Sequence, residues 1–393
     1  MTSKLRGIHD FDKRMRRSLR HLEKVKILDS NRELITEFHN YLLAKGISKA
    51  RVSRYVRVLC LYAELIGDKK FKELTKKDLV GVVGTIESRD YTNWTKVTYK
   101  TMLKKFITWL EGDEEVPDKI KWVNLTCKKT KKLPEEILTQ EEVKKLIECA
   151  PNERDKAFIA TLYESGCRIG EVGNLQIKHI QFDKYGCVLM VNGKTGQRRV
   201  RVMAAVPYLA DWLNKHPDRR PDAALWVALR PYPPERLRYD TIRHNLRKIA
   251  KLAAIDKKVN PHAFRHARAT HLCNHLTEAQ MKEYFGWTQD SAMASVYIHL
   301  SGRDVDKALL KMHGIVIDEE GKDEAIKLVP CDRCGQGNAP TNKYCGKCGL
   351  ILDVKEALEV ERLNREKDEV MNLILSDPDI KRLAIEKLKV RHG

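Results

Sequence analysis

The chain has 393 residues, of which 42% are hydrophobic and 33% charged, and its 74 Lys and Arg outnumber 54 Asp and Glu to give a formal net charge of +20. This composition excludes a broadly disordered protein and predicts two or three domains with a polyanionic partner. No apolar run reaches the roughly 18 residues of a membrane span, and the N-terminus is too charged for a secretory signal. We therefore expect a cytoplasmic protein with no membrane partner.

The first part of the chain is predicted to be helical. Residues 1–27 are rich in basic side chains and are expected to form an exposed N-terminal arm or helix. Between residues 28 and 112, apolar residues recur every 3.6 positions in four segments, and Thr75 and Asp78 have the spacing of a capping box. Two of these segments are followed by glycines that suit left-handed C-terminal caps, Gly46 and Gly67. Residues 28–112 therefore predict a domain of four packed helices.

A second, mixed domain is predicted after a basic linker. Residues 113–133 lose the helical periodicity, and their Lys-rich stretch KIKWVNLTCKKTKK has no amphipathic face. Periodicity returns at residues 134–315, where Thr139 and Glu142 again have capping-box spacing. Within this domain, a stretch around Gly-Lys-Thr-Gly alternates with a period of two, which indicates an antiparallel hairpin. We expect an α+β domain with a small antiparallel sheet between helices.

The ten cysteines are of two kinds. Six are isolated and are expected to be reduced and buried: Cys60, Cys127, Cys149, Cys167, Cys187 and Cys273. The other four form two CxxC pairs ten residues apart, a spacing typical of structural zinc sites: Cys331, Cys334, Cys345 and Cys348. Two disulfides or an iron site are the alternatives. We predict a zinc ribbon at residues 328–352, followed by two C-terminal helices within residues 353–393.

Four motifs supply cations, a proton donor and a hydroxyl nucleophile, as a metal-free attack on a phosphodiester requires. They are YESGCRIGEVGNL with Arg168, VNGKTGQRRVRV with Lys194, NPHAFRHARATHL with His262 and Arg265, and FGWTQDSAMASVYIHL with Trp287 and Tyr297. Each residue alone has an ordinary explanation, such as a surface cation or a core aromatic. Their occurrence together and in this order predicts DNA strand transfer.

The ordered set resembles the active site of the tyrosine recombinase, or lambda integrase, family and is similar to archaeal integrase and Xer-like members. The resemblance covers residues 28–315, with a helical core-binding (SAM-like) domain followed by a catalytic domain, and it leaves out the zinc ribbon and the C-terminal helices. It implies site-specific recombination through a 3′-phosphotyrosyl intermediate, with no cofactor required for catalysis. In this resemblance Tyr297 is the nucleophile.

The resemblance also implies roles for the other residues. Arg168 and Arg265 would bind the non-bridging phosphate oxygens, and Lys194 would protonate the departing 5′ oxygen. His262 would donate a hydrogen bond or accept the tyrosyl proton. Two residues would support these groups, Trp287 by packing or through its indole, and Glu171 by orienting Arg168. Trp287 replaces the commoner His, and its ten-residue interval to Tyr297 is one residue longer than in the common form. We assign no role to His266, His271 and His299.

Partners and alternatives follow from the same resemblance. Double-stranded DNA is the expected substrate, and a tetramer on DNA is the expected assembly, with the segment RDVDKALLKMHG docking onto a neighbouring protomer. The zinc ribbon would bind flanking DNA through Lys343 and Lys347, contact an accessory protein, or brace the C-terminal helices. The enzyme would integrate or excise a mobile element or resolve dimers, and would be nucleoid-associated. A type IB topoisomerase-like enzyme and a non-catalytic zinc-ribbon regulator are the alternatives.

Overall fold

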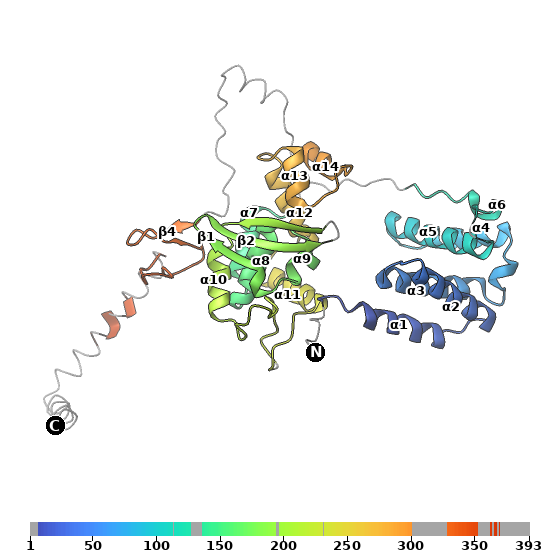
Figure 1. Ribbon diagram of the computed structural model, residues 1–393, viewed down its shortest axis with the longest axis horizontal. Helices are drawn as coiled ribbons and strands as arrows, with labels where there is room; N and C mark the ends of the chain where they lie inside the picture. Colours follow the sequence, from blue (N-terminus) through green and yellow to red (C-terminus); the bar gives the residue numbers. More distant parts are fainter. Residues whose placement is uncertain are drawn as a thin grey trace, which may run out of the picture. The chain divides into compact units, whose positions relative to one another are not determined.

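The computed structural model describes residues 7–112, 114–126, 136–193, 196–230, 232–300 and 328–352, together with 362, 363, 365–367 and 369. The chain divides into two compact units, one formed by His9–Lys132 and the other by Met1–Ile8 with Leu133–Gly393. Each is visible in Figure 1. None of the helices in the described part of the chain combines the length and the apolar composition of a membrane span.

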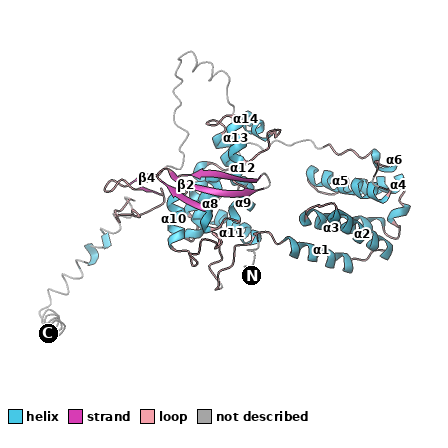
Figure 2. Ribbon diagram, in the orientation of Figure 1, coloured by secondary structure: helices cyan, strands magenta, loops and turns pink. Residues whose placement is uncertain are grey.

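The first unit is built from helices, as its 3.6-residue periodicity predicts. In chain order they are α1 (Phe11–Lys24), α2 (Asp29–Ala44), α3 (Lys49–Ile66), the short 3₁₀ turn η1 (Phe71–Glu73), α4 (Lys76–Ser88), α5 (Asn93–Leu110) and α6 (Asp118–Lys121) (Figure 2). Their apolar faces enclose an aromatic centre in which Phe38 and Phe71 both meet the edge or face of Phe106, with ring centroids 5.2 and 4.9 Å apart. Apolar burial therefore stabilises this unit.

Helix α1 belongs to this core and is not the exposed arm or helix expected of residues 1–27. Met15, Leu22 and Val25 are buried, and α1 packs along α3. The basic side chains of α1 hide this face in the sequence, since only every third or fourth residue is apolar. The helical unit thus begins before residue 28.

The predicted caps are present with one exception. Both capping boxes form, between Thr75 and Asp78 and between Thr139 and Glu142, each with the reciprocal side-chain and backbone hydrogen bonds. Gly46 follows α2 with φ of +71°. Gly67 also has a positive φ, +61°, but its ψ of −124° lies outside the left-handed helical region, so it is not the predicted type of cap.

The second unit places helices around a small antiparallel sheet, which confirms the predicted fold class. The sheet has the order β1 (Ile180–Asp183), β2 (Gly186–Gly193) and β3 (Gly196–Val202). Gly193 pairs with Gly196, which closes the predicted hairpin around residues 194 and 195. The helices, shown in Figure 2, are α7 (Gln140–Glu148), α8 (Glu153–Ser165), α9 (Ile169–Gly173), α10 (Val206–Asn214), α11 (Tyr239–Leu252), α12 (Pro261–Leu272), α13 (Glu278–Phe285) and α14 (Met293–Leu300).

The N-terminal end of the described chain is anchored in this second unit. Ile8 is 3% exposed within its core; its N–H donates to Asn174 Oδ1 at 2.9 Å, and its carbonyl accepts from Tyr239 N at 3.1 Å. Only His9 and Asp10 separate this anchor from α1. The segment that precedes α1 therefore packs next to the C-terminus of α9.

Candidate active site and metal centre

The C-terminal turn of α13 is the point on which three arginines converge. Gly286 adopts a left-handed conformation (φ 61°, ψ 48°), so that its N–H and that of Trp287 bond back to Glu283 and Lys282 and close the helix. The next three carbonyls, of residues 284, 285 and 286, have no partner within the helix. They accept from Arg198 Nε at 3.2 Å, Arg265 Nη2 at 2.8 Å and Arg168 Nη2 at 3.1 Å, respectively. The negative end of the helix dipole favours these cations.

Glu171 supplies the negative charge between two of these arginines. Its side chain is 2% exposed; it accepts two bonds from Arg198 at 2.9 and 2.8 Å and lies 3.2 Å from Arg168 Nη1. Burial opposes ionisation of Glu171, but hydrogen bonds and charge from Arg198, and then from Arg168, hold its pKa below the ordinary value. A Cβ at Gly193 would lie 2.1 Å from Glu171 Oε1, so the hairpin can approach this carboxylate only with glycine there.

Arg265 is the most enclosed of the three arginines. Only 7% exposed, it donates to the carbonyls of Gly166 at 2.9 Å and Phe285 at 2.8 Å. Its guanidinium also lies over the rings of Phe285 and Trp287, 5.1 and 5.5 Å from their centroids. Burial lowers the pKa of Arg265 to about 10, and the charge of Arg168 acts in the same direction, so the cation persists at neutral pH. Arg168 is more accessible, with 34% of its side chain exposed.

Tyr297 lies on α14 against the same turn. Its ring stacks on Trp287 with centroids 5.6 Å apart and planes 2° from parallel, and Trp287 in turn stacks on Phe285 at 4.9 Å. The Tyr297 hydroxyl is hydrogen-bonded to Nδ1 of His266 on α12. Burial raises the pKa of Tyr297 to about 12, partly offset by the charge of Arg265. The turn after α13 therefore contacts both the arginines and the tyrosine.

The structure brings together most of the residues expected at the site. Arg168, Glu171, Arg265, Trp287 and Tyr297 are joined through the α13 turn by the contacts above. Lys194 lies outside the described residues; those that flank the tip of its hairpin, Gly193 and Gly196, are paired. His262 stands in the first turn of α12 and is exposed, whereas Arg265, three residues later on the same helix, is buried.

Sequence patterns did not indicate a role for two polar residues of this region, Arg198 and His266. Arg198 is one of several basic residues on β3, and only its inward position in the period-two alternation distinguishes it from Arg199 and Arg201. His266 follows Arg265 directly and carried no pattern that separated it from neighbouring histidines. Both act through partners distant in the sequence, which local motifs do not reveal.

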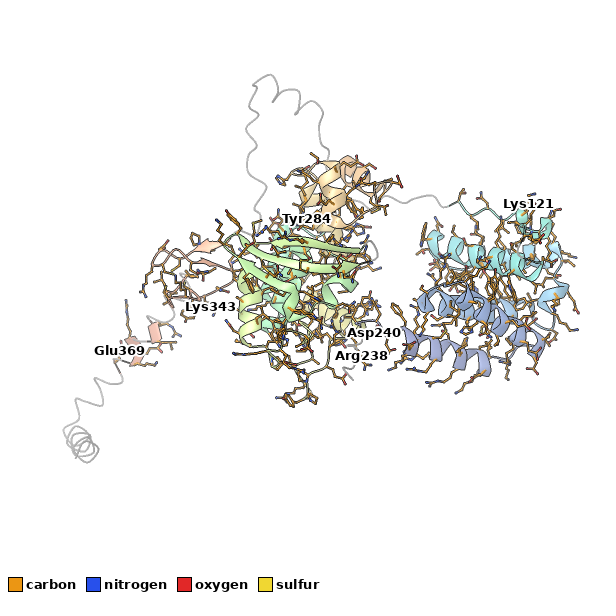
Figure 3. The ribbon with its side chains drawn as sticks, viewed as in Figure 1. Lys121, Arg238, Asp240, Tyr284, Lys343 and Glu369 are labelled. Carbon is orange, nitrogen blue, oxygen red and sulfur yellow. The ribbon has the colours of Figure 1, made fainter. Side chains whose placement is uncertain are left out.

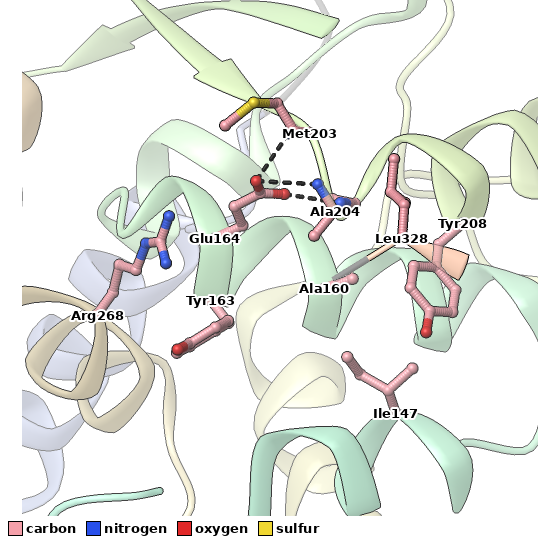
Figure 4. A pocket seen from close by; sticks show the side chains of 10 residues that line it. Ile147, Ala160, Tyr163, Glu164, Met203, Ala204, Tyr208, Arg268 and Leu328 are labelled. Carbon is pink, nitrogen blue, oxygen red and sulfur yellow. Dashed lines mark hydrogen bonds between the residues drawn. The ribbon is translucent and has the colours of Figure 1, made fainter. Parts of the chain in front are cut away.

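Glu164 braces the hairpin from the opposite side. Its buried carboxylate accepts three backbone N–H bonds from Met203, Ala204 and Ala205, at 2.7, 3.0 and 2.7 Å, as Figure 4 shows in part. Its own carbonyl accepts from the Tyr284 hydroxyl at 2.7 Å. Tyr284, labelled in Figure 3, thus links α8 to the α13 turn. Beside this brace lies a mainly apolar cavity of about 390 Å³ lined by Ile147, Tyr163, Met203, Tyr208, Arg268 and Leu328, among others.

The four C-terminal cysteines form a cluster suited to one metal ion. Their Sγ atoms all lie within 4.8 Å of one another, with Cys331 to Cys348 at 3.5 Å and Cys334 to Cys345 at 3.6 Å. A disulfide requires about 2.05 Å, whereas tetrahedral zinc with bonds of about 2.3 Å separates its sulfurs by about 3.8 Å. Each CxxC pair is followed by a glycine of positive φ, and each makes the same backbone bond, from Gly335 N to the carbonyl of the first cysteine and from Gly349 N to that of the third. The geometry therefore fits a shared ion.

The loop between the two cysteine pairs packs on the core of the second unit and on its helix α10. Ala339 is fully buried in that unit's core, and Thr341 Oγ1 donates to the Tyr208 hydroxyl on α10 at 2.9 Å. The next residues of this loop, among them Lys343 (labelled in Figure 3), face α8 and α10 across a cavity of about 500 Å³. The cysteine cluster is thus attached to the helix that directly follows the sheet.

Comparison with known proteins identifies the second unit. Residues 136–303 match the model of the phage integrase family. Tyrosine recombinase XerA of Pyrococcus furiosus is 28% identical over 280 residues, which cover 70% of this chain and 93% of XerA. Tyrosine recombinase XerD of Ralstonia nicotianae is 26% identical over 299 residues, covering 71% and 93%.

Solved structures share the fold. The XerH site-specific recombinase bound to its difH substrate has a TM-score of 0.54 at 18% identity, covering 79% of this chain and 98% of the XerH chain. A lambda integrase dimer bound to a core site has a TM-score of 0.56 at 15% identity, covering 69% and 78%. Residues 136–303 therefore carry the phage integrase match, and about 70% of the chain is similar to proteins named tyrosine recombinases.

Proposed function

We propose that this enzyme performs site-specific recombination with Tyr297 as its nucleophile and Arg168, Arg265 and Lys194 as its phosphate-activating cations. The observation that most supports this assignment is the turn after α13, whose carbonyls bind the arginines and whose Trp287 stacks on Tyr297. A phosphate held by the arginines would therefore lie near the phenol. The net charge of +20 favours binding to duplex DNA.

The chemistry follows from these groups. Arg168 and Arg265 would stabilise the negative charge that grows on the non-bridging oxygens, and their bonds to backbone carbonyls fix them before the substrate arrives. His262, exposed at the start of α12, would donate a hydrogen bond to the same phosphate. The Tyr297 oxygen bonds to phosphorus as the bond to the 5′ oxygen breaks, and Lys194 protonates that oxygen. Glu171 and Arg198 act as positioning residues, because Glu171 contacts Arg168 and Arg198 contacts the Glu171 carboxylate.

In this arrangement, Tyr297 cleaves the phosphodiester that is bound by the arginines of its own protomer. Trp287 and His266, which contact Tyr297, belong to the same chain as the arginines. A mixture of Arg168→Ala and Tyr297→Phe proteins tests this point. Cleavage in cis predicts that no protomer of the mixture is competent, so activity stays absent. Recovery of activity would show that Tyr297 is delivered to a neighbouring protomer.

A nicked suicide duplex carrying the cognate site tests the nucleophile. We expect wild-type protein to remain covalently attached to the 3′ end and Tyr297→Phe protein to leave none attached, because phenylalanine has no hydroxyl. Absence of covalent product from wild-type protein would favour a non-catalytic regulator. Recombinant product from paired sites separates recombination from topoisomerase-like resealing of one strand.

Assembly and location are also proposed. A solved lambda integrase neighbour is a tetramer bound to a Holliday junction, and exchange between two duplexes requires four cleavages. We propose the same tetramer on DNA for this protein, acting on element or chromosomal DNA at the nucleoid in the cytoplasm. Integration, excision and dimer resolution are all compatible with this chemistry, and mapping covalent cleavage positions on genomic DNA distinguishes them.

Zinc is the metal proposed for the four cysteines. A tetrathiolate with closed coordination is the donor set of a structural zinc site, and it leaves no open position for catalysis. Because Ala339 and Thr341 are attached to the core and to α10, the proposed role of the ribbon is to brace the second unit rather than to bind DNA or an accessory protein. Metal analysis of the purified protein, with one zinc per chain expected, tests the assignment.

A further inference from the structure

His266 on α12 stands directly beside Arg265 and contacts the proposed nucleophile. Its Nδ1 is hydrogen-bonded to the Tyr297 hydroxyl, and the two ring centroids are 5.7 Å apart. Helix α12 packs against both α8 and α14, and the Tyr297 side chain is 3% exposed. His262, one turn earlier, is exposed, whereas His266 is half-buried. The residue that meets the phenol in this fold is therefore His266.

We propose that His266 is a catalytic residue that takes the proton of Tyr297 as it attacks phosphorus, and that His262 instead serves the phosphate. This inference rests on the proposed function, since it assumes that Tyr297 is the nucleophile. Transfer requires a neutral imidazole with its own proton on Nε2, so that Nδ1 accepts the hydrogen bond of the hydroxyl. The hydrogen bond places donor and acceptor in contact before the substrate binds.

Each half of the reaction moves one proton through His266 and one through Lys194. The phenolic O–H bond breaks, its proton moves to His266 Nδ1, and the oxygen's electron pair forms the bond to phosphorus. The bond from phosphorus to the 5′ oxygen breaks, and that oxygen takes a proton from Lys194. In the second half, the 5′ hydroxyl of a partner strand attacks, its proton passes to Lys194, and the His266 imidazolium returns its proton to Tyr297. The imidazolium would face the cation of Arg265, and the bound phosphate would offset their repulsion.

A buried phenol needs such an acceptor. Burial raises the pKa of Tyr297 to about 12, so the hydroxyl stays protonated at neutral pH, even though the charge of Arg265 acts in the opposite direction. Because a phenol is a weak nucleophile until its proton leaves, removal of the proton during attack lowers the barrier. Trp287, stacked on the ring, holds the hydroxyl toward α12.

Two substrates separate action on the nucleophile from action on the leaving group. The first is the nicked suicide duplex with an ordinary phosphodiester, and the second carries sulfur in place of the bridging 5′ oxygen. A thiolate leaves without protonation, so sulfur rescues variants that lack the acid and does not rescue variants that lack the base. The readout is the single-turnover rate of covalent complex formation by the full-length protein.

The variants include a matched control on the same helix. His271 makes the same kind of bond, from its Nδ1 to the Tyr163 hydroxyl at 2.7 Å, away from the proposed site. His266→Phe and His271→Phe thus each remove one histidine–tyrosine bond and keep an aromatic ring. His266→Asn keeps an acceptor near the position of Nδ1 but cannot take up the proton. Thermal unfolding of every variant checks that the substituted protein still folds.

The expected result is that His266→Phe and His266→Asn slow cleavage of both substrates by about 100-fold or more, the usual contribution of general base catalysis, while His271→Phe stays within about threefold of wild type. Lys194→Ala should be slow on the oxygen substrate and rescued by sulfur. Rescue of the His266 variants by sulfur, a wild-type rate for His266→Asn, or equal effects of the His266 and His271 variants would overturn the proposal. Absence of covalent complex from wild-type protein would instead refute the assignment of Tyr297.

Discussion

The apolar core of the helical unit and the polar centre around the turn after α13 are stabilised in opposite ways. In the helical unit, the rings of Phe38 and Phe71 each pack edge to face against Phe106, and these contacts involve no charged group. Around the turn after α13 in the second unit, buried Glu171 and Arg265 each depend on specific partners, because an unpaired buried charge is costly. Apolar cores tolerate exchange of one hydrophobic side chain for another, whereas this polar centre depends on the identity of each donor and acceptor. The following substitutions test that difference.

Arg265→Lys should have the largest effect. A lysine ammonium cannot reach the Gly166 and Phe285 carbonyls and a phosphate in the planar, forked geometry of guanidinium. We expect the single-turnover cleavage rate to fall about a thousandfold, in line with loss of a preorganised donor. Arg201→Lys is the matched control, because Arg201 pairs with Asp183 on the exposed face of the same unit. A similar loss in both variants would contradict a special role for Arg265.

Glu171→Gln should have the next largest effect and should appear in stability as well as in rate. Gln keeps one acceptor but removes the charge between Arg168 and Arg198, so we expect a loss of about 3 kcal/mol in the free energy of unfolding, the lower end for breaking a buried ion pair. Urea titration of the unfolding transition measures this loss. An unchanged free energy of unfolding would mean that the two arginines find other partners.

Acid should weaken the polar centre through the same carboxylate. The pKa of Glu171 is lowered in the folded protein, so its stabilising contribution is present above the unfolded-state pKa and is lost as the pH falls through the folded value. We expect the wild-type free energy of unfolding to decrease more steeply with acidification below about pH 4.3 than that of Glu171→Gln. Parallel curves for the two proteins would contradict this assignment.

Phe106→Leu in the helical unit should have a smaller effect. The substitution keeps an apolar side chain, so the loss in the free energy of unfolding should stay below the roughly 3 to 5 kcal/mol that truncation of a buried Phe to Ala costs. Cleavage by the folded protein should continue at a similar rate at saturating DNA. A rate loss like that of Arg265→Lys would mean that the two centres do not differ as described.

The smallest effect should come from the ribbon contact. Thr341→Val keeps the shape but removes the hydrogen bond to Tyr208, and a net loss of about 1 kcal/mol is expected. Removal of the proposed zinc with a chelator should cost more stability than Thr341→Val, because the ribbon is too small to hold its loop in place without metal. If chelation leaves the melting temperature unchanged, the ribbon does not brace the second unit.

Sequence patterns predicted most of the elements, and they failed where partners are distant. The capping boxes at Thr75 and Thr139 formed because the interacting groups are three residues apart. The apolar face of α1 went unrecognised, since a strongly basic helix resembles an exposed arm until a partner helix covers its few apolar residues. Arg198 was missed for a similar reason, because its partner Glu171 lies 27 residues earlier.

The sequence alone determined the chemical inventory of this protein: ordered cations, a tyrosine, two CxxC pairs and helical periodicity, all carried by residue type and short spacing. Only the tertiary structure decided which groups meet. It placed three arginines on the carbonyls at the end of α13, His266 rather than His262 against Tyr297, and Ile8 in the second unit. The physical reason is that a buried polar group must find a partner, and the fold, through contacts between residues far apart in the chain, supplies it.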